Sequence, residues 1–245
     1  MPASNNKRTV SIKRKQYKKY QEFVTFVLLH DQPAFKLKNK TSPVLININK
    51  LTLLEYQLRV INKKFQNYEV IVCTGFLSDQ VNMYLKKKYS KYNIRIIENS
   101  NFTESNSCES TRLCLQNTNN ERILIIDGKI LFDEKIFNNL NLDEAFAISC
   151  KDKNETLEIG INTDRDRNIS YFSYGARYTW SEILFICGKR MISDLEKTLN
   201  EKSFRKKFLF EAINIVTEKH NIRQAVRSAR IIKIQNIKTL ESIKE

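Results

Sequence analysis

Glycine, proline and histidine are scarce in this chain, with five, three and two residues among 245. This scarcity excludes a Gly- and Pro-rich disordered chain, and the 41% hydrophobic content is that of a globular protein with a sizeable core. Two histidines cannot build a histidine-rich metal site. The five cysteines form no C-x-x-C pair, so we expect free thiols in a reducing, intracellular compartment.

Long apolar runs are also missing. The longest run, residues 23–29, is interrupted by Thr25 and is far too short to cross a bilayer. The basic N-terminus is not followed by the apolar segment of a secretory signal. We therefore expect no membrane span, and a location in the cytoplasm or within a particle rather than secretion.

Positive charge is in excess, with 42 Lys and Arg against 27 Asp and Glu and a formal net charge of +15. The first twenty positions hold no acid and seven basic residues, namely Lys7, Arg8, Lys13, Arg14, Lys15, Lys18 and Lys19. We interpret residues 1–20 as a basic arm and residues 21–245 as one domain. Such an arm suits a phosphate backbone, so nucleic acid or a large ribonucleoprotein or viral assembly is the candidate partner. The alternative is a solvated tail without a partner.

Short apolar segments alternate with helical patterns through the first part of the domain. Strands are expected at residues 22–29, 69–74, 94–98 and 122–127, and Thr52 with Glu55 forms a capping-box pattern at a helix start. This alternation predicts βαβ units and an α/β fold with a mostly parallel sheet flanked by helices. A further helix is expected at residues 134–140. Beyond residue 150 the pattern predicts antiparallel strands, then helices at 192–200 and 204–219, and a strand at 231–234.

The strand at 122–127 ends in Asp127-Gly128-Lys129. In open α/β sheets, ligands bind beyond the carboxyl ends of the strands. An acidic residue just after Gly128 could hold a metal over a nucleotide phosphate, but the chain has Lys129 there. Strand alternation places Asp127 on the same face as Lys129, which makes Asp127 a candidate ligand contact. The alternative for Asp127 is a carboxylate that only closes the turn.

Several segments taken together resemble motifs of one family. Residues 43–57 are similar to its "PKxLLPVNGKPLLEYQ" stretch, residues 70–76 to "IIIVTGY", residues 99–110 to "NPxYxxxNNxxSL", and residues 232–237 to "YEIDT". In this order and spacing, the chain resembles the small-molecule nucleotidyltransferases, most closely the phosphocholine cytidylyltransferase-like branch of the sugar-phosphate nucleotidyltransferases. The resemblance covers roughly residue 23 to the C-terminus. It implies a single Rossmann-related, GT-A-like fold.

The resemblance also implies ligand contacts. Asn106 and Ser110 fall where the family contacts a nucleobase or substrate, although either could instead cap the helix that follows. Glu211 falls at a position that is acidic in the cytidylyltransferase-like branch, although glutamates within helices usually face solvent. Lys36 and Lys38 could supply charge to the cleft.

The chain departs from the family where the family's chemistry takes place. The family wraps a triphosphate with a glycine-rich loop, whereas residues 29–35 contain no glycine. The family's two metal aspartates correspond to Lys129 and Gln235, so both carboxylates are lost, and a lysine cannot ligate Mg²⁺ and would repel it.

We therefore predict a nucleotidyltransferase-like protein that has lost catalysis, needs no metal or cofactor, and binds or assembles with an anionic partner. A nucleotide in the ancestral cleft is a second candidate ligand. With Lys129 facing it, the cleft should carry net positive charge. The alternative is an active cytidylyltransferase-type enzyme that acts on phosphocholine or a sugar 1-phosphate and uses Mg²⁺.

Overall fold

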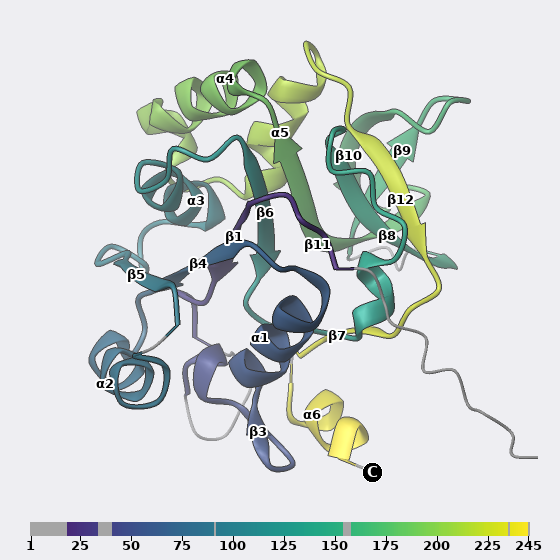
Figure 1. Ribbon diagram of the computed structural model, residues 1–245. Helices are drawn as coiled ribbons and strands as arrows, with labels where there is room; N and C mark the ends of the chain where they lie inside the picture. Colours follow the sequence, from purple (N-terminus) through teal and green to yellow (C-terminus); the bar gives the residue numbers. More distant parts are fainter. Residues whose placement is uncertain (1–18, 34–40, 91, 154–157, 235, 245) are drawn as a thin grey trace, which may run out of the picture.

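The computed structural model describes residues 19–33, 41–90, 92–153, 158–234 and 236–244 (Figure 1). Several candidate residues of the sequence lie outside these ranges, so the structure does not test them. They are Lys7, Arg8, Lys13, Arg14, Lys15 and Lys18 of the arm, Lys36 and Lys38 of the loop, and Gln235.

A nine-stranded mixed sheet forms the centre of the described chain. Its strands are β1 (Val24–Leu29), β4 (Tyr68–Thr74), β5 (Ile94–Glu98), β6 (Arg122–Asp127), β8 (Phe146–Lys153), β9 (Ile159–Thr163), β10 (Ile169–Tyr174), β11 (Tyr178–Cys187) and β12 (Arg223–Arg227). The main order is β10-β9-β11-β6-β1-β4-β5, and β8 lies between β11 and β12. β1 pairs in parallel with β4 and β6, and β5 with β4, while β11 runs antiparallel to β6, β8 and β9. The sheet therefore has the parallel half and the later antiparallel half that the sequence predicts.

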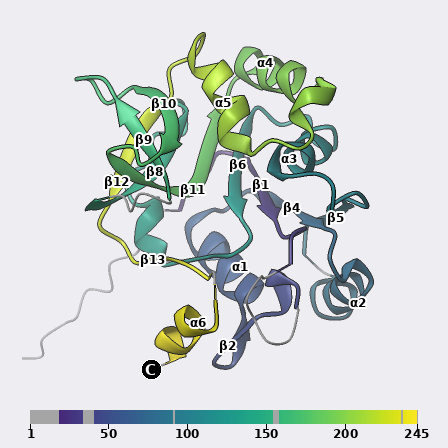
Figure 2. The same ribbon diagram turned by 180° about the vertical axis from the view of Figure 1, so that it is seen from behind.

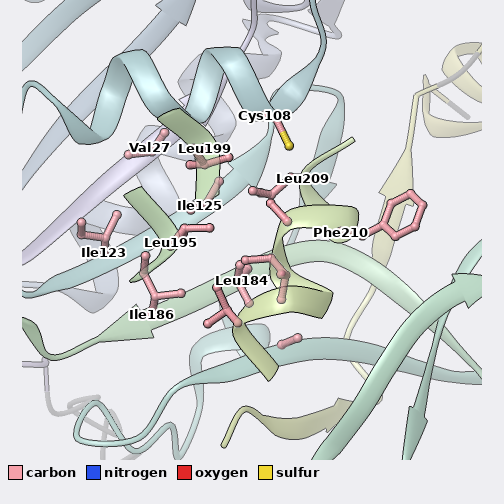
Figure 3. Packing of buried hydrophobic residues seen from close by; sticks show 14 of the residues in the cluster. Val27, Cys108, Ile123, Ile125, Leu184, Ile186, Leu195, Leu199, Leu209 and Phe210 are labelled. Atoms are coloured by element: carbon pink, nitrogen blue, oxygen red, sulfur yellow. The ribbon is translucent and has the colours of Figure 1, made fainter. Parts of the chain in front are cut away.

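Helices cover both faces of the sheet. They are α1 (Leu53–Lys64), α2 (Ser78–Tyr89), α3 (Ser107–Leu115), α4 (Lys189–Asn200), α5 (Leu209–Thr217) and α6 (Ile237–Lys244). Helices α3, α4 and α5 pack on one face and α1 and α2 on the other, as both views show (Figures 1 and 2). Figure 3 shows the first of these layers, where Leu195 and Leu199 of α4 pack over Ile123 and Ile125 of β6. Burial on both faces explains why β1 and β6 read as largely apolar runs in the sequence, with Thr25 the one polar residue within β1.

The start of α1 confirms the capping box. The Thr52 hydroxyl accepts a hydrogen bond from the Glu55 N–H at 3.3 Å, and the Glu55 carboxylate accepts one from the Thr52 N–H at 2.7 Å. Two N–H groups that a helix leaves without partners are thereby satisfied.

Three elements differ from the sequence prediction. Residues 134–140 form only a short 3₁₀ helix, Glu134–Phe137, and the helix expected at 204–219 begins at Leu209 after a second 3₁₀ turn, Lys202–Phe204. The polar strand β12 is absent from the prediction because Arg223 and Arg227 break the apolar signal, and its pairing with β8 decides its conformation.

Lys19 and Tyr20, at the start of the first described range, contact the domain. The Lys19 ammonium donates to the Asn62 carbonyl at 2.7 Å, and the Tyr20 ring stacks on Phe65 with centroids 5.0 Å apart. Both residues thus belong to the packed structure.

Two small antiparallel ribbons complete the fold, β2 (Asn47–Ile48) with β3 (Leu51–Thr52), and β7 (Ile130–Phe132) with β13 (Ile231–Lys233). The second ribbon directly follows the β6 turn, and it places Lys233 opposite Ile130. Across the described ranges, every helix is too short or too polar to cross a membrane.

Candidate functional site

A cavity of about 520 Å³ lies beyond the carboxyl ends of β1 and β6. Asp31 and Gln32 follow β1 into its wall, and Asp127 and Lys129 do so from β6. The far wall comes from β10, β11 and the start of α5. The cavity therefore lies where open α/β sheets bind their ligands.

Two lysines and two carboxylates meet at the base of this cavity. In the antiparallel pairing of β11 with β6, Ile183 lies opposite Ile126. Glu182 precedes Ile183 and Asp127 follows Ile126, so these two acids occupy the next pair of facing positions. The carboxylate of Glu182 forms an ion pair with Lys233. Because the Ile234 N–H donates to the Lys129 carbonyl at 2.9 Å, the backbone that carries Lys233 runs beside the backbone that carries Lys129.

The two carboxylates differ in proton affinity. Burial, and then the negative charge of Asp127, raise the pKa of Glu182 to about 7 against the opposing pull of Lys233 and Lys129. Burial acts on Asp127 in the same direction, but Lys129 and Lys233 outweigh it and hold the pKa of Asp127 below its usual value. A proton shared by this pair therefore resides on Glu182.

This donor set does not fit Mg²⁺. A hard divalent cation needs several oxygen ligands, and here two ammonium groups neutralise the two carboxylates that could provide them. Among the described residues, no group of three or more His, Cys, Asp and Glu side chains could hold a metal ion. We derive no metal-dependent step from this site.

The loop after β1 is built around a buried acid. Asp31, only 2% exposed, accepts hydrogen bonds from Ser110 at 2.8 Å and from Gln32 at 3.0 Å. Burial raises the pKa of this carboxyl, while the Ser110 and Gln32 bonds oppose the shift. An acidic side chain stands where a phosphate-binding loop would offer backbone N–H groups, and its ionised form opposes a polyphosphate at this position.

Behind the loop, His30 is fully buried. Gln57 donates through its amide nitrogen to the Ile130 carbonyl at 2.9 Å, so its oxygen accepts from the His30 Nε2–H at 3.1 Å. Burial lowers the pKa of His30 to about 4, and the imidazole is therefore neutral at physiological pH.

The sequence candidates fall in different places. Asn106 lines the cavity and also caps α3, its Oδ1 accepting from the Ser107 N–H at 2.8 Å. Ser110 is buried and its hydroxyl is bonded to Asp31, so it positions the loop. Lys129 and Asp127 line the cavity as expected.

Glu211 is not in the cavity lining. Its carboxylate accepts from the Phe208 N–H at 2.8 Å at the first turn of α5, so it caps that helix. The expectation of a mid-helix residue is wrong because α5 begins five residues later than the apolar pattern suggests.

Sequence reasoning missed Glu182, Lys233, Asp31 and Glu158. The described lining holds four acids, Asp31, Asp127, Glu158 and Glu182, against the two lysines Lys129 and Lys233. The expected net positive charge of the whole cleft stays a prediction, because Lys36 and Lys38 lie outside the described residues. Of the lining acids, only Asp31 and Asp127 lie at the carboxyl ends of predicted strands, where the rule that ligands bind beyond strand ends could have identified them.

Aromatic side chains also line the cavity. Trp180 of β11 is 7% exposed and packs edge-on against Phe172 with centroids 5.0 Å apart. Tyr174 packs edge-on against Phe210, which in turn stacks on Phe208. Tyr174 and Phe208 are 55% and 43% exposed, so these two lining residues are in contact with solvent.

Solved structures of other proteins share this architecture. A CTP:phosphocholine cytidylyltransferase from Streptococcus pneumoniae superposes with a TM-score of 0.75 at 17% identity, covering 90% of this chain and 97% of that one. An inositol-1-phosphate CTP transferase from T. maritima gives a TM-score of 0.70 at 14% identity, covering 90% and 96%. The chain has a nucleotidyltransferase-like, GT-A-like fold.

Sequence comparison agrees with this nucleotidyltransferase-like fold. A choline-phosphate cytidylyltransferase of Streptococcus pneumoniae (strain ATCC BAA-255 / R6) is 27% identical over 116 residues, a stretch that covers 47% of this chain and 48% of that protein. The match thus spans about half the length of the curated relative. No family model matches the sequence.

Proposed function

We propose that this nucleotidyltransferase-like chain binds a small phosphate monoester in its cleft without metal ions and has lost nucleotidyl transfer. The observation that carries the proposal is the base of the cavity, where Lys129 and Lys233 accompany Asp127 and Glu182. Fixed ammonium groups attract a phosphate without a bridging cation. They do not provide the template that a metal gives to an in-line displacement.

The loop after β1 supports the loss of transfer. Nucleotidyl transfer needs a triphosphate held close to the acceptor, and the buried carboxylate of Asp31 opposes such a charge. The smaller charge of a phosphate monoester at Lys129 and Lys233 avoids this repulsion.

The aromatic residues of the cavity lining suggest what the phosphate carries. Trp180, Tyr174 and Phe208 share this lining with Glu158, and aromatic rings and a carboxylate together suit a cationic group. Phosphocholine has such a group, and the curated relative is named for choline phosphate. Phosphocholine is therefore the ligand that we propose to test first.

Titration calorimetry with phosphocholine, with and without Mg²⁺, tests the proposal. We expect binding that does not depend on Mg²⁺, no pyrophosphate release with CTP, and at least tenfold weaker binding after Lys129→Ala. Lys86→Ala, at an exposed position of α2, is the matched control and should leave affinity unchanged. Binding that requires Mg²⁺ would contradict the proposal.

An active cytidylyltransferase is the second candidate. Asn106 lines the cavity, as the family resemblance implies for a substrate contact. Pyrophosphate release with CTP and either phosphocholine or a sugar 1-phosphate would favour this candidate. Mg²⁺ would then be its cofactor.

A docking role of the basic arm is a further part of the proposal, within an intracellular protein. Lys7 to Lys18 would bind nucleic acid or a ribonucleoprotein or viral particle through phosphates. Because Lys19 and Tyr20 are packed, the deletion that tests this role removes residues 1–18 only. Nucleic-acid affinity should fall steeply with salt and drop on deletion, and a salt-independent affinity would contradict the role.

A further inference from the structure

Glu182 has a backbone conformation that its residue type rarely adopts. It lies within β11, yet its φ is +53°, in the left-handed region that favours glycine. The pairing of β11 with β8 shifts at the same place, between the pairs Trp180–Ser149 and Leu184–Ala147. Such bulges redirect a side chain and concentrate next to functional sites.

The bulge points a carboxylate into a crowded charge cluster. The Glu182 side chain is only 16% exposed and pairs with Lys233 from β13. Asp127 faces it from β6, and Lys129 from the turn that follows. Glu158 acts on the same lysine, Lys233, from the segment before β9.

We propose that Glu182 is a built-in competitor of the anionic ligand: it holds Lys233 in the free protein and releases it, taking up a proton from solvent, when a phosphate or sulfate group binds at Lys129 and Lys233. This inference rests on the proposed anion-binding function and adds its regulation by pH. The ammonium of Lys233 then exchanges one anionic partner for another.

Proton uptake follows from the charges around Glu182. Once Lys233 pairs with the ligand, the Glu182 carboxylate has lost this positive partner. The negative charge of Asp127 remains beside it, and the ligand adds a second negative charge. Its carboxylate form is then disfavoured more strongly, and protonation relieves the repulsion. Because the pKa of Glu182 is already about 7 in the free protein, the exchange takes place near neutral pH.

Inorganic sulfate is the probe of choice, because it stays a dianion from pH 6 to 8.5 and its own titration cannot imitate the effect. We expect sulfate affinity, measured without Mg²⁺, to fall about tenfold per pH unit above pH 7. Calorimetry at pH 8 in two buffers of different ionisation enthalpy should show uptake of close to one proton per sulfate.

Two variants assign the effect to this side chain. Glu182→Gln removes the titration, and Glu182→Gly removes the carboxylate at a φ that glycine adopts without strain. Both should bind sulfate more tightly than the wild type at pH 8 and with little pH dependence. Glu104→Gln, an exposed acid outside the cavity lining, should keep the wild-type pH dependence.

The outcomes separate this inference from the function on which it rests. If sulfate binds with the same pH dependence in the wild type and both Glu182 variants, the competitor role is wrong while the anion site stands. If neither sulfate nor phosphocholine binds the wild type or either Glu182 variant at any pH, the proposed function fails as well.

Discussion

The turn after β6 packs directly on the imidazole of His30, with Gly128 at the contact. A Cβ atom on Gly128 would lie 2.5 Å from His30 Nδ1 and 2.4 Å from the Leu29 carbonyl oxygen. The Gly128 N–H donates to that same carbonyl at 2.8 Å. The glycine before Lys129 is therefore required by close approach of two strand ends, and this packing fixes the backbone from which Lys129 enters the cleft.

Gly128→Ala should lower the free energy of unfolding by about 2–3 kcal/mol, because the backbone must shift to admit the methyl group. Denaturant unfolding measures the loss. Gly175→Ala is the matched control, since its φ is +67° but no atom lies within 4 Å of the added Cβ. Its smaller loss, about 1 kcal/mol, would reflect conformation alone. A loss at Gly128 no larger than at Gly175 would contradict the packing argument.

Stability should fall as the pH drops from 7.5 to 5 because of His30. Its pKa is about 4 in the folded protein and about 6.5 when unfolded, so the unfolded chain binds more protons between these values. The contribution is therefore fully present above pH 6.5, and about 2 kcal/mol of it is lost at pH 5. Urea unfolding at both pH values measures the change.

His30→Gln is the variant for this comparison. It lacks the titrating group, so its own unfolding free energy should change less between pH 7.5 and 5 than that of the wild type, whatever its absolute stability. His220, which pairs with Asp194 at 2.9 Å on a different part of the molecule, provides the control position. An unchanged pH dependence in His30→Gln would contradict the assignment to His30.

Tyr20→Phe should destabilise the protein by about 1–3 kcal/mol. The hydroxyl donates to the Phe137 carbonyl at 2.7 Å and accepts from the Leu140 N–H at 2.7 Å, and the variant leaves both groups without this partner. Thermal unfolding gives the measurement. Tyr92→Phe, at a half-exposed ring, should change little, so equal effects at the two tyrosines would show that Tyr20 is not packed as described.

Asp31→Asn should increase affinity for CTP, by about tenfold if one negative charge beside the phosphates is removed, which corresponds to about 1.4 kcal/mol. Equilibrium binding of labelled CTP provides the measurement. Asp133→Asn removes a carboxylate of the same type from a helix cap outside the cavity lining and should have no effect. Unchanged CTP binding in Asp31→Asn would mean that Asp31 does not exclude the triphosphate.

The parallel half of the fold could be predicted because local signals there agree with the tertiary structure. β1 and β6 are buried on both faces and read as largely apolar runs, and Thr52 with Glu55 specifies the start of α1 through contacts three residues apart. The order of these elements, together with the family motifs, was enough to predict the α/β fold.

Prediction from local sequence patterns failed where contacts with distant segments decide the secondary structure. β12 carries arginines at both ends and becomes a strand only through pairing with β8, some 75 residues earlier. Glu211 caps α5 because that helix begins at Leu209, after a 3₁₀ turn that the apolar pattern does not mark.

The sequence by itself determined that the strand ending at Asp127 carries Lys129 where a metal ligand would be expected, since this depends only on residue order. Only the tertiary structure decided what surrounds that lysine. Antiparallel pairing of β11 with β6, and a bulge at which Glu182 has a left-handed φ, bring Glu182 close to Lys129. The ribbon of β7 and β13 brings Lys233 there from about 100 residues further along the chain. The charge balance of the cleft is a sum over groups that only folding brings together, so no pattern along the chain could have revealed it.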